Sequence, residues 1–232
     1  MRPSKLFHPT RLREVRFIRK WLATLPEGPV RDFGCGDGVY SRWVAGRRAV
    51  VGFDPWESHV RKASKDLSDE TGNALFFVGD ATRTALRDAS FASVVSVCVL
   101  EHVPDIGRAI GEVNRVLRPG GAFLFTVDSL DEPHTPDDYV AYHRNRFYIA
   151  DFLTLERVRA LLDAHRFEML ECQSIGNNRF SGTVLRLFAR RYSVYRWFSP
   201  LLSASVWLAD KICNAPDHGY ILLFAARKKG QR

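Results

Sequence analysis

The feature that most limits the fold is an alternation of short apolar runs with longer mixed segments. The runs VRDF, AVVGFD, ALFFVGD, SVVSVCV and AFLFTVD are rich in β-branched and aromatic residues, and all lie in the first 128 residues. The segments between them are long enough to form crossover helices. This alternation predicts an α/β fold, in which a parallel sheet carries helices on both faces.

Two more strand-like runs, FEMLECQSI and GYILLFAARKK, follow in the second half of the chain. The first comes after a helix predicted from Thr154 to His165, which begins with a threonine N-cap. Another helix is predicted in DIGRAIGEVNRVLRPGG, which ends at a Pro-Gly-Gly stop and has helical spacing of its apolar residues Ile106, Ile110, Val113 and Leu117.

Length and composition predict a single domain, because 232 residues with 46% apolar content can bury one sizeable core. The 4 cysteines are scattered and form no CxxC pair, so we expect neither a metal site nor a disulfide framework. No apolar run reaches the roughly 18 residues that a membrane span needs, and the N-terminal region lacks the pattern of a secretory signal. These features predict a cytoplasmic protein.

The net charge of +8 is placed unevenly along the chain. From Gly176 onward there are 10 Lys and Arg against 2 Asp and Glu, whereas the preceding residues balance 24 against 24. The basic excess therefore belongs to the last quarter of the chain, which we interpret as an elaboration of the core fold.

The first strand leads into a turn with glycines at alternate positions. In a parallel sheet the ligand lies beyond the carboxyl ends of the strands, so this turn is placed to meet it. Glycine permits positive φ and close approach of a ligand, and backbone N–H groups there can hold a carboxylate or phosphate. The candidate ligand-binding residues of this turn are Asp32, Gly34, Cys35, Gly36 and Gly38.

The ends of the next strands carry further candidates. A carboxylate after the second strand is placed to accept hydrogen bonds from ribose hydroxyls, and one after the third could accept an adenine amino proton. A tryptophan beside the first of these could lie on the adenine face. An adenosine that carries an α-amino acid would use the whole set, which comprises Asp54, Pro55, Trp56, Asp80, Ala81 and Leu100.

The segments VRDFGCGDG, VGFDPWE, FVGDATR, VCVLEHVPD and VNRVLRPGGAFLFTV resemble the successive motifs of class I S-adenosylmethionine-dependent methyltransferases. The resemblance covers Val30 to Asp128. It implies S-adenosylmethionine as cofactor, with Asp32 and Gly34 at its methionine moiety, Asp54 at the ribose, Asp80 and Ala81 at the adenine, and Leu100 bordering it.

The same resemblance implies a Rossmann-like, doubly wound, mostly parallel seven-stranded sheet. Its last strand would run antiparallel to the others and follow a helical insertion. We therefore expect one methyltransferase domain over residues 1–232, divided into an N-terminal helical cap (1–29), the cofactor-binding core (30–128), an acceptor-side loop, helix and strand (129–175), the basic amphipathic insertion (176–218), and the last strand with a basic tail (219–232).

The methyl acceptor must lose a proton, which a group with a pKa near neutrality removes best. His102 follows the fourth strand, where the family's loop faces the methyl group, although it could instead only shape the cofactor loop. His143 lies in the long connection after the fifth strand. We predict His102 and His143 as catalytic candidates, and as substrate-side candidates Tyr139, Tyr142 and Arg144.

The resemblance predicts methyl transfer to an oxygen or carbon of a small-molecule or lipid-linked acceptor. Nucleic acid is disfavoured, because neither an Asn/Asp-Pro-Pro-Tyr motif nor a Pro-Cys pair follows the fourth strand. Two alternatives remain at this stage. One is a non-catalytic partner subunit that binds S-adenosylmethionine, and the other is an NAD-dependent oxidoreductase, which the glycine spacing fits poorly.

The basic insertion has an amphipathic pattern. Helical projection places Arg186 and Arg190 opposite an apolar side made of Val184, Leu185, Phe188, Tyr192 and Tyr195. Such a helix suits peripheral contact with an anionic membrane at its inner face or a lid over a lipid-like acceptor. It equally suits a helical hairpin that packs on the sheet or on the partner subunit of a homodimer.

Overall fold

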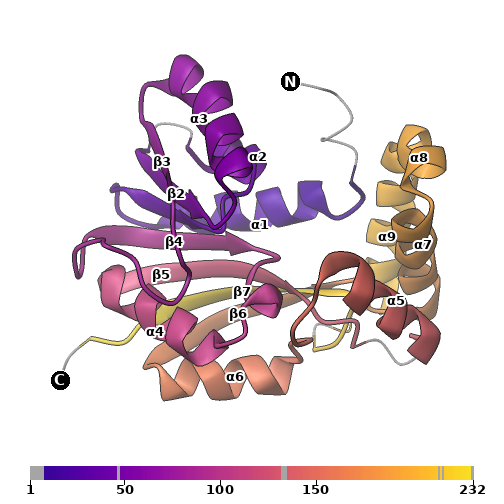
Figure 1. Cartoon of the computed structure of the whole chain (residues 1–232). Helices are drawn as coiled ribbons and strands as arrows, with labels where there is room; N and C mark the ends of the chain where they lie inside the picture. The colour runs from indigo at the N-terminus through magenta and orange to yellow at the C-terminus, as the bar shows by residue number, and fades with distance from the viewer. Residues whose placement is uncertain (1–7, 46–47, 132–134, 214, 216, 231–232) are drawn as a thin grey trace.

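Seven strands form one sheet in the order β3-β2-β1-β4-β5-β7-β6 (Figure 1). The computed structural model describes the chain except residues 1–7, 46–47, 132–134, 214, 216 and 231–232. The strands are β1 (Val30–Phe33), β2 (Val50–Asp54), β3 (Ala74–Val78), β4 (Phe91–Val97), β5 (Leu117–Asp128), β6 (Phe167–Ile175) and β7 (Ile221–Lys228).

The strands β1 to β5 pair in parallel, whereas β7 runs antiparallel between β5 and β6. This confirms the predicted mostly parallel sheet with an antiparallel last strand. The chain steps outward from β1 to β2 and β3, then returns to the other side of β1 with β4. The carboxyl ends of β1 and β4 therefore flank the switch point, where a doubly wound sheet binds its ligand.

Helices cover both faces of the sheet (Figure 1). Helices α4 (Ile106–Val116) and α6 (Leu155–Ala164) pack on one face, where the largest apolar cluster lies. Helix α1 (Arg11–Thr24) and the insertion pack on the other face, and α3 (Glu57–Thr71) packs near β2 and β3. Helices α2 (Val39–Ala45) and α5 (Asp137–Phe147) and the short η2 (Leu100–His102) stand at the carboxyl ends of the strands.

Two predicted helices can be compared directly with the structure. Thr154 caps α6 as predicted, since its Oγ1 accepts a hydrogen bond of 3.3 Å from the Arg157 amide. Helix α4 ends at Val116, earlier than predicted, because Leu117 already pairs with Phe91 in the sheet. The Pro-Gly-Gly segment is thus the start of β5 and not the end of the helix.

The insertion forms α7 (Arg179–Arg190), α8 (Tyr192–Tyr195), η3 (Arg196–Phe198) and α9 (Ser199–Cys213). Leu185 and Phe188, from the predicted apolar side of α7, are buried against the domain. Arg190 forms an ion pair of 2.9 Å with Asp138 of α5. The apolar side of α7 therefore packs on the protein's own core, which is one of the alternatives that the sequence left open for the insertion. Among the described helices, none has the length and apolar content needed to cross a bilayer.

Candidate active site

The glycines of the β1 turn serve different purposes. A Cβ on Gly34 would lie 2.6 Å from the Val99 methyls, and one on Gly38 would lie 3.0 Å from the Ala63 Cβ of α3. A Cβ on Gly36 would meet nothing within 4 Å. All three residues have positive φ, which a non-glycine residue rarely adopts. Close packing explains Gly34 and Gly38, and Gly36 leaves open space beside the backbone.

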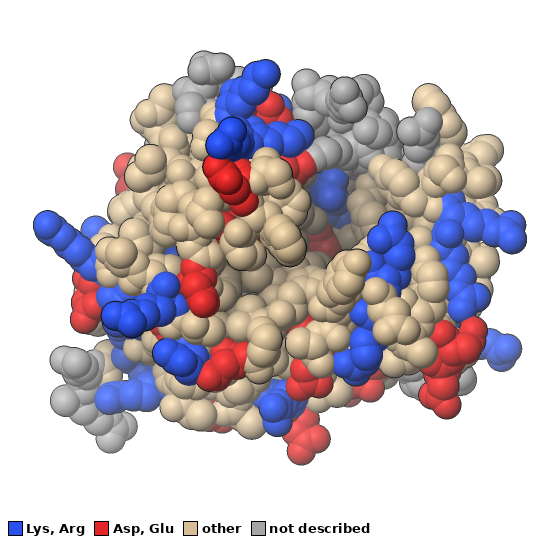
Figure 2. Space-filling view, in the orientation of Figure 1, with Lys and Arg blue, Asp and Glu red and all other residues tan. Residues whose placement is uncertain are grey.

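The open side of this turn faces a cavity of about 770 Å³ at the carboxyl ends of β1, β2 and β4. A volume of this size accommodates a nucleoside-sized ligand. Figure 2 shows the surface hollowed between the α2–α3 end of the molecule and the α5–α8 side. The predicted residues that line this first cavity are Gly34, Cys35, Gly36, Asp54, Pro55, Trp56 and His102.

The Asp54 carboxylate contacts three residues that line the first cavity. One carboxylate oxygen accepts a hydrogen bond of 2.9 Å from the Gly36 amide. The other accepts from the Trp56 amide at 3.0 Å and lies 3.1 Å from the His59 Nδ1. Since a carboxylate offers about four lone-pair positions, Asp54 retains acceptor capacity toward a ligand hydroxyl.

A second cavity of about 630 Å³ adjoins the first. The two share much of one wall, formed by His8, Arg11, Tyr40, Val97, Cys98, His102, Phe147, Tyr148 and Tyr192. The second cavity extends toward Asp128 and His143 and is closed by Leu185 and Phe188 of α7. Two molecules bound in these cavities would therefore meet at the shared wall.

His102 lies in this shared wall with its ring exposed. Its Nδ1 is 3.3 Å from the Tyr148 carbonyl oxygen. A carbonyl oxygen only accepts, so this contact assigns the proton to Nδ1 and leaves Nε2 of the neutral ring as an acceptor. His102 is therefore arranged to receive a proton.

His143 is buried, and both of its ring nitrogens are engaged. Its Nε2 lies 2.8 Å from an Asp128 carboxylate oxygen, and its Nδ1 lies 3.3 Å from the hydroxyls of Tyr139 and Tyr220. Those two hydroxyls are 2.6 Å apart. His143 thus belongs to a hydrogen-bonded network with Asp128, Tyr139 and Tyr220. Asp128 lines the second cavity.

Two partly buried residues, Cys98 and Asp128, form a cluster with the buried Glu101. Among the residues described, Cys98, Glu101 and Asp128 place ligand-type atoms within 4.8 Å of one another. Burial, followed by the nearby Asp128 charge, raises the pKa of both the Cys98 thiol and the Glu101 carboxyl. Raised pKa values favour the protonated forms, and these bind metal ions poorly.

Sequence comparison places the core among known enzymes. A family model described as a methyltransferase domain matches residues 31–125. An O-methyltransferase of Pyrenophora dematioidea is 26% identical over 178 residues, which cover 72% of this chain and 67% of that protein. A ubiquinone biosynthesis O-methyltransferase of Coxiella burnetii is 31% identical over 127 residues, covering 54% of this chain and 53% of the relative. These matches identify residues 31–125 as a methyltransferase domain and support the class I S-adenosylmethionine-dependent family for the chain.

Solved structures show the same fold. Phosphoethanolamine N-methyltransferase 2 of Haemonchus contortus, in complex with S-adenosyl-L-methionine, has a TM-score of 0.71 at 20% identity and covers 94% of this chain. That match spans 52% of the Haemonchus chain. Geranyl diphosphate methyltransferase in complex with GPP and sinefungin has a TM-score of 0.69 at 15% identity, covering 94% of this chain and 78% of that one. This chain thus spans about half the length of several of its relatives.

Several predicted cofactor residues of this methyltransferase lie outside the first cavity, namely Asp32, Gly38, Asp80, Ala81 and Leu100. Leu100 is fully buried in the core. The exposed Asp80 carboxylate accepts from the Thr82 amide at 2.7 Å and from the Thr82 hydroxyl at 2.8 Å. One Asp80 carboxylate oxygen is therefore engaged by the loop that follows β3.

The predicted substrate-side residues Tyr139, Tyr142 and Arg144 also lie outside the lining of both cavities. Arg144 donates to the carbonyls of Ile149 and Ala150 at 3.2 and 2.9 Å, and so closes the end of α5. The Tyr139 hydroxyl belongs to the hydrogen-bonded network of His143 and Tyr220. The Tyr142 ring lies 5.4 Å from the Arg190 guanidinium. None of these three residues lines the second cavity.

Sequence reasoning missed the contribution of the N-terminal segment to both cavities. His8 and Arg11 lie in the shared wall, and Glu14 lines the second cavity, where it accepts from the Tyr40 hydroxyl. Tyr40 could have been found from the sequence, because it lies in the first turn of the helix that follows the glycine turn. His8 and Arg11 had none, since only the packing of α1 on the sheet brings them there.

Asp32 gives a prediction about stability and pH. Burial raises the pKa of Asp32 from 3.8 to about 6, although its carboxylate accepts from the Ser41 hydroxyl. An acid whose pKa is raised on folding stabilises the fold below about pH 4 and destabilises it as pH rises through about 6. The difference of about two pKa units corresponds to about 3 kcal/mol.

The variant Asp32→Asn is neutral, so it avoids the free-energy cost of a buried charged carboxylate. It also keeps an oxygen that can accept from the Ser41 hydroxyl. We expect it to raise the free energy of unfolding of the ligand-free protein at pH 8, with little change at about pH 3.5, below the ordinary aspartate pKa of 3.8. Urea unfolding at both pH values measures this. Destabilisation of the variant at pH 8 would show that the Asp32 carboxylate is needed in its charged form.

Proposed function

We propose that this protein transfers a methyl group from S-adenosylmethionine to an oxygen or carbon of a small or lipid-linked acceptor. The observation that carries the proposal is the wall shared by the two cavities, which places His102 between them. The first cavity suits the cofactor, and the second suits the acceptor. The relatives of this protein support an oxygen acceptor, since they include a ubiquinone biosynthesis O-methyltransferase and a malonyl-[acyl-carrier protein] O-methyltransferase.

The residues of the first cavity fit the cofactor. The open face of Gly36 admits the ligand close to the backbone, and Asp54 keeps acceptor capacity for a ribose hydroxyl. The Trp56 ring is exposed at the rim, where it can cover the adenine. Bound there, S-adenosylmethionine would supply a methyl group on an activated sulfonium. The protein then needs mainly to position the acceptor and exclude water.

His102 is the group we assign to proton removal. Its Nε2 can accept the proton that a hydroxyl or carbon acid of the acceptor releases as the new methyl bond forms. The Tyr148 carbonyl keeps the ring in the required tautomer, because it accepts from Nδ1. The proton thus passes from the acceptor to His102 and then to solvent, which the exposed ring contacts.

The second cavity indicates the chemistry of the acceptor. Aromatic rings of Phe147, Tyr148, Phe188 and Tyr192 form much of its wall, and Arg11 and Arg146 bring two cations to it. An aromatic or unsaturated body packs well on such rings, and a guanidinium binds a carboxylate or phosphate. We therefore favour an apolar or aromatic acceptor with an anionic group.

Asp128 would orient the acceptor in this cavity. His143 contacts one of its carboxylate oxygens, and the Cys98 thiol lies 3.8 Å from the other, which retains acceptor capacity for a hydroxyl of the acceptor. We expect Asp128→Asn to lower kcat/KM by about tenfold or more, mainly through a higher KM, because a charge-assisted hydrogen bond contributes about 1.5–3 kcal/mol. Steady-state kinetics tests this. An unchanged KM with lower kcat would instead assign Asp128 to proton transfer.

The test of the function is incubation of the purified protein with methyl-labelled S-adenosylmethionine and a cell extract. We expect label in an extractable product, partitioned into the organic phase for a lipid-linked acceptor and into the aqueous phase for a polar one. Cofactor binding without any labelled product would favour the non-catalytic partner subunit. Tight binding of NADH in place of S-adenosylmethionine would overturn the proposal.

A further inference from the structure

The insertion exposes a continuous apolar stripe to water. Trp197, Leu201, Leu208 and Ile212 recur at helical spacing along η3 and α9, and their side chains are 77%, 72%, 53% and 75% exposed. Ala204 fills the position between them on the same side. No charged residue occurs between Arg196 and Asp210. Isolated exposed apolar residues are normal on proteins, but a contiguous stripe of this kind marks an interaction surface.

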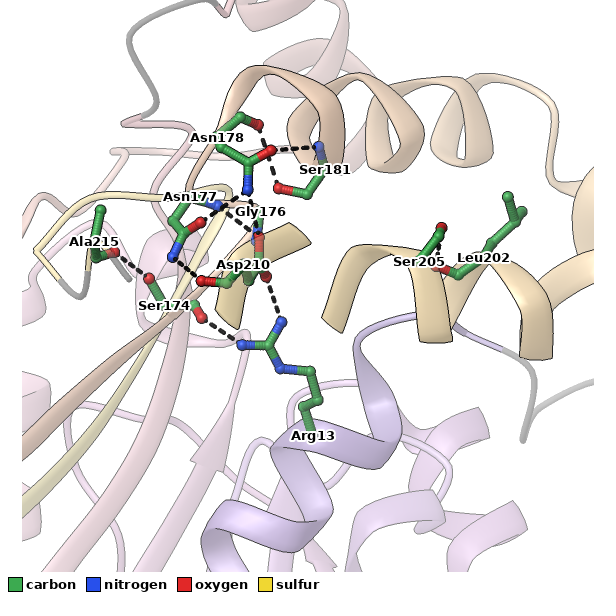
Figure 3. A network of polar contacts seen from close by, with 10 residues as sticks. All are labelled: Arg13, Ser174, Gly176, Asn177, Asn178, Ser181, Leu202, Ser205, Asp210 and Ala215. Atoms are coloured by element: carbon green, nitrogen blue, oxygen red, sulfur yellow. Dashed lines mark hydrogen bonds and ion pairs between the residues drawn. The ribbon is translucent and has the colours of Figure 1, made fainter. Parts of the chain in front are cut away.

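A buried polar network fixes which side of α9 faces outward (Figure 3). Asp210, on the side opposite the stripe, accepts hydrogen bonds from the amides of Gly176 and Asn177 at 2.9 and 3.2 Å. Arg13 of α1 pairs with the same carboxylate and also donates to the Ser174 carbonyl at 2.7 Å.

This network ties α9 to α1 and to the start of α7. Val206, also opposite the stripe, is fully buried in the core. The helix cannot turn its stripe inward without breaking a buried ion pair and exposing core, so the stripe is a stable feature of the folded domain.

We propose that this stripe docks on the surface of an anionic lipid bilayer. The positive charge of the insertion favours an anionic bilayer over other partners. Of the 10 basic residues from Gly176 onward, Lys211 lies on α9 itself and Arg191 is exposed at the end of α7, whereas Arg227, Lys228 and Lys229 belong to the last strand and its tail. The one acidic residue of α9, Asp210, is buried and paired. Figure 2 shows Lys and Arg side chains along the α5–α7 side of the molecule. A second copy docked by the same face would meet like charge, whereas an anionic headgroup layer complements it.

The residues around the stripe suit a bilayer interface. Trp197 and the half-exposed Trp207 have an apolar body and a polar N–H, the character found where membrane and water meet. The Lys211 Nζ lies 5.2 Å from the Trp207 ring, and Arg191 is exposed at the end of α7. The helix would lie in the plane of the interface with the stripe in the headgroup layer.

The docked position has a consequence for the acceptor. The same insertion supplies Leu185, Phe188 and Tyr192 to the second cavity, so the stripe and the cavity wall belong to one helical unit. Docking would bring that cavity close to the bilayer. Docking itself does not depend on methyl transfer, so failure of one proposal leaves the other standing.

The test uses the full-length protein and sedimentation with vesicles. We expect binding to vesicles of phosphatidylcholine mixed with phosphatidylglycerol at low salt, and little binding to phosphatidylcholine alone. The double variant Leu201→Gln with Leu208→Gln should lower the partition coefficient at least about tenfold. The matched control, Leu75→Gln with Val78→Gln, changes two exposed apolar residues of the edge strand β3 and should bind like the unmodified protein.

Circular dichroism and cofactor affinity of both double variants should match those of the unmodified protein, which excludes a folding defect. Two results would overturn the proposal. One is an unmodified protein that ignores anionic vesicles at low salt. The other is a dimer, measured by analytical ultracentrifugation, that the α9 double variant dissociates, since the stripe would then join two copies.

Discussion

Replacing His102 with alanine is expected to lower kcat by about a hundredfold or more, because general base catalysis commonly contributes factors of this size. The affinity for S-adenosylmethionine should hardly change, since the ring makes its one described hydrogen bond to Tyr148 and none to the turn that would hold the cofactor. Turnover and calorimetric binding on the same preparation measure both quantities.

A matched control is His218→Ala, which removes a histidine that is paired with Asp217 and lies outside both cavities. It should keep full turnover. If His102→Ala also kept full turnover, proton removal by this residue would be excluded. Equal losses of cofactor affinity and turnover would mean that His102 shapes the cofactor loop instead.

The second large effect is expected from Asp54→Ala, which should weaken S-adenosylmethionine binding at least about tenfold. Charge-assisted hydrogen bonds are worth about 1.5–3 kcal/mol each, and the variant loses those to the ribose. It also releases the amides of Gly36 and Trp56, which Asp54 holds in the ligand-free protein. Calorimetric titration with S-adenosylmethionine gives the affinity directly.

The control for this variant is Asp66→Ala, on the exposed side of α3, where the carboxylate pairs with Lys62. That change should leave the affinity unaltered. An Asp54→Ala protein that is folded and binds with unchanged affinity would contradict the assignment of the first cavity to the cofactor.

The sheet and its topology could be predicted from the sequence because both depend on local patterns. Apolar runs define the strands, and the family motifs order them, so the switch point between β1 and β4 follows without a structure. The same logic correctly brought Gly34, Asp54 and His102 to one cavity, because the carboxyl ends of parallel strands share an edge.

The remaining site residues depend on contacts that leave no local pattern. Asp80 follows the end of β3 as expected, but the hydroxyl and amide of Thr82 both donate to one of its carboxylate oxygens within the loop. His143 and Tyr220 are 77 residues apart and meet only because β7 inserts beside β5. Likewise, α7 places its apolar side on the domain, where Leu185 and Phe188 are buried and line the second cavity.

The central claim is that the cofactor and the acceptor meet at the wall shared by the two cavities. A crystal structure of the protein with S-adenosylhomocysteine tests it most directly. We predict ribose hydroxyls within hydrogen-bonding distance of the Asp54 carboxylate and the thioether sulfur directed past His102 into the second cavity. A product bound outside the first cavity, or with its sulfur directed away from the second, would contradict the claim.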